Sequence, residues 1–290
     1  MKYSFIHKRM FFILLFLFSA IRAQTLTITN NTGHPVIVTN DKKEVTINNR
    51  DKKEFTETDR IEIKLSDNLV SYINLFLDPT DKLKITLDKN DEVIYSGDKA
   101  ALHEYLTETL NVDTFSKINT YEQIGQKKNI GELKNVSELL LLDVLKKVQL
   151  PNIVISPEDK VSTRKLKNYI KYNWLYTIFS TLNRRETSFK KEAINYYFKK
   201  YIETDIPKLS CTKSLHYSVI EILAKNKSLL LVELPTYPIV EHTDDDNVNQ
   251  YLPQNCQKEY FQQKYDYLNH IEGHNKEYYK KVLIEKFNEK

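Results

Sequence analysis

Glycine and cysteine are both scarce in this sequence, which contains only five glycines and two cysteines. The glycines are not clustered as in the dinucleotide-binding fingerprint, and no Gly-Lys-Ser/Thr sequence ends a phosphate-binding loop. The Gly-x-Ser-x-Gly nucleophile elbow of α/β-hydrolases is also absent. These absences exclude the common nucleotide-binding motifs, and the sequence predicts no cofactor.

The two cysteines, Cys211 and Cys256, lie far apart in the sequence. The chain therefore lacks the Cys-x-x-Cys pair that places a reactive thiolate beside its resolving partner. In an oxidising compartment the two can form one structural disulfide, and two separate buried thiols are the alternative. A role in thiol-disulfide exchange with a partner oxidoreductase is a further hypothesis.

The sequence has only one long apolar run, Met10–Ile21, which follows a positively charged start and precedes the small residue Ala23. This order is typical of a cleavable secretory signal peptide, which we predict over residues 1–23. The run is shorter than the roughly 20 apolar residues that span a bilayer, so a membrane anchor is less favoured. We expect an exported chain, periplasmic or secreted, with no transmembrane segment after removal of the signal.

The excess of positive charge belongs to the same segment. The full sequence has 43 Lys and Arg against 39 Asp and Glu. Residues 1–23 contain no acidic residue, and their basic residues are Lys2, Lys8, Arg9 and Arg22. Without them the two kinds of charge balance. The composition therefore predicts no nucleic-acid partner.

Residues 25–96 show short segments in which apolar and polar side chains alternate. The clearest is Ile61–Leu65, and the others lie near residues 26–28, 36–38, 45–47, 72–77, 83–87 and 93–95. Turn sequences such as Asp78–Asp81 separate them. Short strands at this spacing predict a small antiparallel β-sandwich over residues 24–97. The mixed-charge run Asp51–Glu54 is typical of solvated surface.

The apolar period changes at Ser96–Asp98, and from Lys99 onward it is helical, which predicts an all-α domain over residues 98–290 and an α+β fold. Ser156–Asp159 has the residue types that begin a helix, which we expect to run to about Leu182. Other helices are predicted near residues 133–148, 188–204, 212–226, 255–270 and 275–288. Residues 228–254 are predicted to be an irregular connection with at most a short helix.

Two groups of residues are candidate metal ligands. His270 and His274 are four apart and would share a helix face, as zinc ligands do, but no Glu directly follows the first His and Gly273 weakens the helix. Surface histidines are the favoured interpretation, and a metal-dependent hydrolase is a third functional hypothesis. His242 with Asp244–Asp246 lacks the spacing of a calcium loop, so a solvated acidic loop is favoured there.

Aromatic residues are dense between residues 169 and 201. Tyr169, Tyr172, Trp174 and Tyr176 are candidates for stacking on a ligand or gripping a peptide. Aromatic residues at helical spacing are more often part of a packed core, which is the favoured alternative.

The run Asn74–Leu87, followed by Tyr95–Leu106, resembles the N-terminal region of exported TlpA-like proteins of the thioredoxin family. In that family a strand ends in a Pro-Gly-Asp turn, and a Ser-Gly-x-x-Ala-x-x-Asn sequence opens the first helix. Here Thr80 stands in place of the usual Gly and His103 in place of the Asn. The resemblance covers roughly residues 25–205, including the predicted helix from Ser156, and implies the same β-plus-helical architecture and an exported location.

The TlpA-like family carries its chemistry on a Cys-x-x-Cys pair in a thioredoxin domain, and this sequence contains no such pair. No catalytic residue can therefore be transferred to it. We expect a non-enzymatic binding or accessory protein that contacts a protein or peptide partner. The alternative is an accessory role in periplasmic thiol-disulfide exchange through Cys211 and Cys256.

Overall fold

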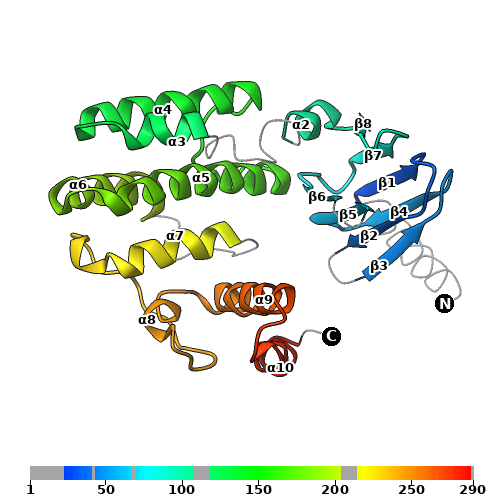
Figure 1. Cartoon of the computed structure of the whole chain (residues 1–290). Coiled ribbons are helices and arrows are strands. Elements are labelled where there is room, and N and C mark those ends of the chain that lie inside the picture. Colours follow the sequence, from blue (N-terminus) through cyan, green and yellow to red (C-terminus); the bar gives the residue numbers. More distant parts are fainter. Residues whose placement is uncertain (1–22, 41–42, 67–68, 107–117, 204–213, 289–290) are drawn as a thin grey trace, which may run out of the picture. The chain divides into compact units, whose positions relative to one another are not determined.

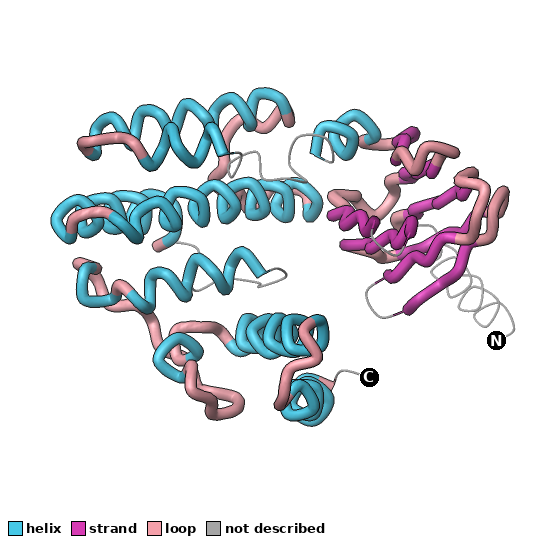
Figure 2. The backbone as a smooth tube through the Cα atoms, in the orientation of Figure 1, coloured by secondary structure: helices cyan, strands magenta, loops and turns pink. Residues whose placement is uncertain are grey.

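The computed structural model describes residues 23–40, 43–66, 69–106, 118–203 and 214–288 (Figures 1 and 2). Among these residues the strands come first and the helices follow, so the fold is of the predicted α+β class. The chain divides into two compact units. Unit 1 comprises Met1–Thr114 with Ile155–Leu166, and unit 2 comprises Phe115–Val154 with Lys167–Lys290. Residues 1–22, which hold nearly all of the predicted signal peptide, lie outside the described residues.

Unit 1 contains two four-stranded sheets. The first has the order β4-β1-β7-β8 and consists of β1 (Thr25–Asn30), β4 (Lys52–Thr56), β7 (Lys82–Leu87) and β8 (Val93–Gly97). The second has the order β3-β2-β5-β6 and consists of β2 (Val36–Asn40), β3 (Lys43–Ile47), β5 (Arg60–Ser66) and β6 (Leu69–Asn74). Figure 1 shows how the chain alternates between them.

One strand pair corrects the prediction that the strands are antiparallel throughout. β1 and β7 run parallel, while the other neighbouring pairs are antiparallel. Two strands joined by a tight hairpin are antiparallel, whereas parallel neighbours need a long crossover connection. Between β1 and β7 the chain builds the whole second sheet, so no hairpin links these two strands.

The sequence also missed β4, because the residues before Phe55 showed no alternation. β4 is an edge strand in which Phe55 alone is buried, while Lys52, Lys53 and Glu54 are exposed. The charged run was correctly placed at the surface, but its backbone pairs with β1. A strand with a single buried side chain carries no period-2 signal.

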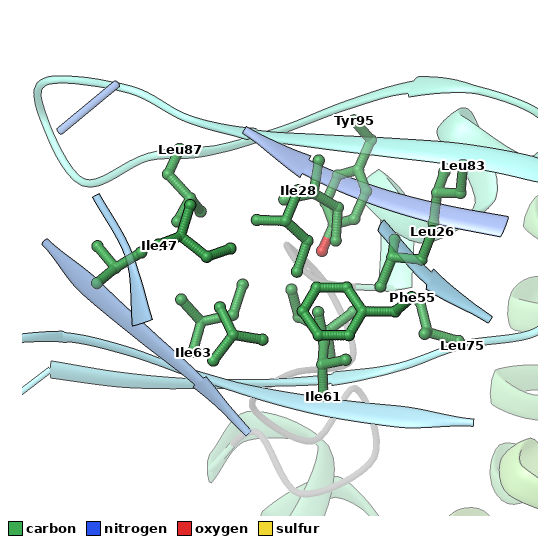
Figure 3. Close-up of a cluster of buried hydrophobic side chains, with 14 of the residues drawn as sticks. Leu26, Ile28, Ile47, Phe55, Ile61, Ile63, Leu75, Leu83, Leu87 and Tyr95 are labelled. Carbon is green, nitrogen blue, oxygen red and sulfur yellow. The ribbon is translucent and has the colours of Figure 1, made fainter. Parts of the chain in front are cut away.

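Both sheets contribute side chains to one buried cluster (Figure 3). Every second residue of the central strands points into it, and Ile28, Ile61, Ile63, Leu83 and Ile85 are fully buried. The alternation in the sequence therefore marks the buried face of each strand, as period-2 patterning requires. In Figure 3, Phe55 from β4 and Tyr95 from β8 also point toward this cluster.

The helices begin with α2 (Ala100–Tyr105) in unit 1. Those that follow are α3 (Ile118–Gly125), α4 (Ile130–Lys147), α5 (Val161–Thr181), α6 (Thr187–Tyr197), α7 (Ser214–Lys225), α8 (Asp246–Asn249), α9 (Gln254–His270) and α10 (Lys276–Phe287). Most match the predicted ranges within a few residues, whereas α3 was not predicted. Of the helices that the structure describes, none combines the length and apolar character needed to cross a bilayer.

The start of α5 differs from its prediction. The helix begins at Val161, and Ser156–Asp159 forms a turn instead. The Asp159 carboxylate accepts the Ser156 N–H at 2.8 Å, and the Asp159 N–H donates to the Ser156 carbonyl at 3.1 Å. Helix caps and turns use the same residue types, because both satisfy a nearby backbone N–H with a short polar side chain.

Lys99 fixes the connection between β6 and β7. Its Nζ donates to the Phe76 carbonyl at 3.1 Å, to the Asp78 carboxylate at 2.8 Å and to Ser162 Oγ at 2.9 Å. The Asp81 carboxylate lies 2.8 Å from the same nitrogen. Partial burial alone would raise the pKa of Asp78, but the hydrogen bonds from Lys99 and Ser162 outweigh it and hold that pKa below its usual value. The first turn of α5, which contains Ser162, thus belongs to unit 1.

Candidate functional site

A buried aromatic cluster joins three helical segments of unit 2. Trp174 of α5 is fully buried, and its Nε1–H donates to the carbonyl of Ser137 on α4 at 2.8 Å. Its ring meets Tyr201 edge-on at a centroid distance of 4.8 Å and Tyr197 at 5.5 Å. The hydroxyls of Ser137 and Tyr197 are hydrogen-bonded at 2.7 Å. The indole therefore has its polar N–H satisfied and its apolar faces packed, as a core tryptophan requires.

A polar cluster lies beside these aromatics, and Glu138 of α4 is its centre. One oxygen of the Glu138 carboxylate, Oε1, accepts hydrogen bonds from the hydroxyl of Tyr196, from Lys200 Nζ at 2.8 Å and from the hydroxyl of Tyr201 at 3.0 Å. Lys200 also donates to the Tyr196 hydroxyl at 3.0 Å. Lys134 Nζ lies 4.0 Å from the centroid of the Tyr196 ring. We call Glu138, Tyr196, Lys200 and Tyr201 the Glu138 cluster.

A π-helical turn after α6 explains how two tyrosines five residues apart reach the same carboxylate. The turn spans Phe198–Ile202, and the N–H of Glu203 donates to the carbonyl of Phe198 at 3.0 Å. In such a turn residues five apart come onto one face, whereas an α-helix would rotate them apart. Tyr196 and Tyr201 can therefore both face α4. Turns of this kind are rare and occur frequently at functional sites.

The ionisable groups of the Glu138 cluster have pKa values far from neutral pH. Burial alone would raise the pKa of Glu138, but the hydrogen bonds from Lys200 and the two tyrosines lower it below its usual value. Burial alone would lower the pKa of Lys200, but its bonds to Glu138 and the tyrosines raise it. Burial raises the pKa of Tyr201 to about 12 and also raises that of Tyr196. The cluster is thus a fixed ion pair with two neutral phenols, which suits binding better than proton transfer.

Two leucines on the outer face of α4 lie next to this cluster and face solvent. Leu139 is 65% exposed and Leu142 is 57% exposed. Leu142 lies four residues after Glu138 and four before Lys146, so the three share one helix face. We call Leu139, Leu142, Lys146 and Lys200 the leucine surface. Exposed apolar side chains set among charged groups are typical of a protein-interaction surface.

The four aromatics predicted as a binding set do not form one surface. Tyr172 and Trp174 are fully buried, Tyr169 is partly buried, and Tyr176 is 38% exposed. A ligand at the surface can therefore reach Tyr176 but not the two buried rings. The same aromatic-rich stretch of sequence also contains Tyr196 and Tyr201, whose hydroxyls reach Glu138 on α4. Their partner Glu138 lies about sixty residues earlier in the chain, and no local pattern predicts that contact.

The predicted metal candidates lie in the last part of the chain. His270 is the final residue of α9, and His274 is exposed before α10. The carboxylate of Asp246 accepts from the Thr243 N–H at 2.8 Å and contacts His242 at 2.6 Å, so it is used within its own loop. Across the described ranges, no three His, Cys, Asp or Glu side chains gather in a way that could hold a metal ion.

Cys256 of α9 is completely buried and is disulfide-bonded. Its predicted partner Cys211, the other cysteine of the sequence, lies outside the described residues. Thiol-disulfide exchange requires an attacking thiolate to reach one of the two sulfurs. The burial of Cys256 blocks that attack at its sulfur, which favours a structural disulfide over an exchange site.

Lys171 is a buried cation that belongs to neither cluster. It lies on α5, is 2% exposed, and its Nζ is 5.3 Å from the centroid of the Tyr172 ring. Burial lowers the pKa of Lys171 from 10.5 to about 8. Between these two values the unfolded chain binds more protons than the folded one, so stability rises with pH across that window. Below pH 8 the full cost of burying the charge remains, on the order of 3 kcal/mol.

We therefore expect one lysine of the folded protein to titrate near pH 8, measured from the ¹³Cε resonances of labelled lysine. Lys171→Met should remove that resonance. It should also increase thermal stability at pH 7, because the variant has no ammonium group that must lose its hydration on folding. Lys146→Met, on an exposed position of α4, is the control and should leave the titrating resonance in place. Lysine resonances that all titrate above pH 10 would contradict this assignment.

In comparisons with known proteins, no model of a protein family matches the chain, and no curated protein matches it either.

Proposed function

We propose that this chain is an exported, non-enzymatic binding or accessory protein, periplasmic or secreted, that contacts an acidic and apolar segment of a protein or peptide partner through its leucine surface. The observation that carries this proposal is the pair of solvent-facing leucines, Leu139 and Leu142, beside a locked ion pair. The Glu138 cluster has no group that exchanges a proton near neutral pH, so its geometry supports recognition better than catalysis.

The charge around the leucine surface supports an acidic partner. α4, α6 and the π-helical turn together contain seven lysines and four acidic residues. Three of the acids form ion pairs, Glu138 with Lys200 at 2.8 Å, Asp143 with Lys147 at 2.7 Å and Glu192 with Lys134 at 4.0 Å. The lysines still outnumber the acids on these segments, so their net charge is positive. Opposite charge on the partner would speed association and fix its orientation, while the leucines would supply apolar burial.

The proposed architecture and location fit an exported binding or accessory protein. We propose that the two sheets of unit 1 pack as a β-sandwich, because both contribute to one buried cluster. The signal-like residues 1–23 and the resemblance of Asn74–Leu87 and Tyr95–Leu106 to TlpA-like proteins support export and an accessory role. The buried Cys256 makes an exchange function the weaker alternative.

The mature chain, residues 24–290, would be tested against a displayed library of random peptides. We expect the selected peptides to be rich in Asp and Glu with an interspersed Leu or aromatic residue, and their binding to weaken with salt. A variant carrying Leu139→Lys and Leu142→Lys should lose affinity about tenfold or more, as expected for central apolar contacts. Affinity should be measured by fluorescence anisotropy on synthetic copies of the selected peptides.

Ile284→Lys provides a matched control, since Ile284 is also an exposed apolar residue of unit 2, 47% exposed, but lies on α10. It should bind the selected peptides like the wild type. Peptides that bind the double variant as tightly as the wild type would contradict the proposed surface, as would a selection without acidic residues.

A further inference from the structure

Phe76 lies just beyond the end of β6, where the backbone has left the strand ladder. Its N–H and C=O therefore need partners from elsewhere. The N–H donates to Nε2 of His103 at 3.2 Å, and the C=O accepts from Nζ of Lys99 at 3.1 Å. His103 lies within α2 and Lys99 is the residue that caps it. The side chains of Lys99 and His103 thus satisfy both backbone groups of one residue, Phe76.

The hydrogen bonds of His103 define its protonation state. Nδ1 lies 2.9 Å from the carbonyl oxygen of Lys99, which can only accept, so Nδ1 carries the proton. Nε2 faces the N–H of Phe76 and must therefore be the unprotonated acceptor. The ring is 1% exposed and lies between Tyr95 and Phe76, with centroid distances of 6.0 and 6.3 Å. This site fits a neutral imidazole in one tautomer.

The charges around the ring are few. Burial is the main cause that lowers the pKa of His103 below 6.5. The hydrogen bond to the Lys99 carbonyl and the Asp81 carboxylate both act to raise the pKa of His103, whereas the Lys99 ammonium acts to lower it further. Asp78 acts on the site through its bond to Lys99, and Glu104, the next residue on α2, is exposed. Tyr95 from β8 contributes its ring face.

We propose that His103 is a proton-operated latch: its neutral ring ties the β6–β7 connection to α2, and protonation in acid opens that tie. A proton on Nε2 would place its N–H opposite the N–H of Phe76, so that two donors would face each other and the Phe76 amide would have no acceptor. The unfolded chain takes up this proton near pH 6.5 and the folded chain only at lower pH. Unit 1 therefore loses stability as the pH falls from about 6.5 through the lower pKa of the folded state.

Amide hydrogen exchange of the mature chain tests the latch. We expect the protection factor of the Phe76 amide, corrected for the intrinsic exchange rate, to fall at least tenfold between pH 7 and pH 4. The Ile28 amide, in the central strand β1, should change much less. In His103→Gln the side-chain oxygen can accept from Phe76 at any pH, so protection of that amide should vary less than about threefold. This variant keeps the neighbouring carboxylates, so it isolates the effect of His103.

An equal fall in the wild type and in His103→Gln would overturn the proposal, and so would constant protection in the wild type. If the variant does not fold, the ¹⁵N chemical shifts of the His103 ring nitrogens in labelled wild-type protein provide the test. A transition of Nε2 to its protonated shift that coincides with the loss of Phe76 protection supports the latch. A ring that stays neutral at pH 4 while protection is lost overturns it.

Discussion

Trp174→Ala is expected to lower the free energy of unfolding by about 3–5 kcal/mol, the range for removing a large buried aromatic side chain. The change would leave a cavity among Tyr197 and Tyr201 and would remove the donor to the Ser137 carbonyl. Both costs add, because the surrounding helices can collapse only partly into the space. Urea denaturation followed by circular dichroism measures the loss.

Tyr176→Ala is the matched control for this prediction, because it removes a large aromatic side chain two residues along the same helix. Tyr176 is 38% exposed, whereas Trp174 is fully buried. We expect the control to cost less than about 1 kcal/mol, as is usual for partly exposed side chains outside a packed core. Equal losses for the two variants would show that Trp174 is not a core residue, and would return the aromatics of α5 to the list of binding candidates.

Loss of the disulfide at Cys256 should produce an effect of similar size. Removing a native disulfide typically costs about 2–5 kcal/mol, mainly because the unfolded chain gains freedom. If the partner is Cys211, as the sequence predicts, the closed loop contains α7, α8 and the irregular segment between them. A loop of that length places the expected cost in the upper half of the range.

Three variants test the pairing: Cys211→Ala, Cys256→Ala and the double substitution. If the two sulfurs are joined, the double variant should be no less stable than the weaker single variant, because one bond is lost in every case. Reductant should destabilise the wild type and leave all three variants unchanged. Additive losses in the double variant, or a wild type that is insensitive to reductant after denaturation and refolding, would contradict a Cys211–Cys256 bond.

The parts of the fold that the sequence predicted are those in which side-chain burial follows the period of the backbone. The alternation over Ile61–Leu65 predicted a strand there, and β5 is confirmed with Ile61, Ile63 and Leu65 buried. The helices predicted over residues 255–270 and 275–288 are α9 and α10 almost residue for residue. Where burial is nearly absent, as in β4, no period exists and the strand was missed.

The candidate site was harder to predict for a different physical reason. Tyr196, Lys200 and Tyr201 belong to one stretch of sequence, but their common acceptor Glu138 is on another helix. Hydrogen bonds between side chains that are distant in sequence depend on how helices pack, and a single sequence does not report that. The π-helical turn adds to the difficulty, because a predicted α-helix would have turned Tyr201 away from Tyr196.

The turn Asp78–Asp81 is a feature that the sequence did predict. The family that the sequence resembles has a Gly where this chain has Thr80. The structure closes the turn with a bond from the Asp81 N–H to the Asp78 carbonyl at 3.0 Å, and Thr80 is not among the residues with positive φ. A glycine is therefore not required there. Gly97 is different, because its φ is 88° and an added Cβ would lie 2.4 Å from the carbonyl oxygen of Lys82.

The charged edge strand β4 has a consequence for how copies of this chain meet. An unpaired strand edge offers a row of backbone donors and acceptors on which a second chain can build an intermolecular sheet. Lys52, Lys53 and Glu54 project from that edge, and a foreign strand that docked there would have to bring its own side chains against these three charges. Charges of this kind on an edge strand disfavour edge-to-edge pairing between copies of a protein.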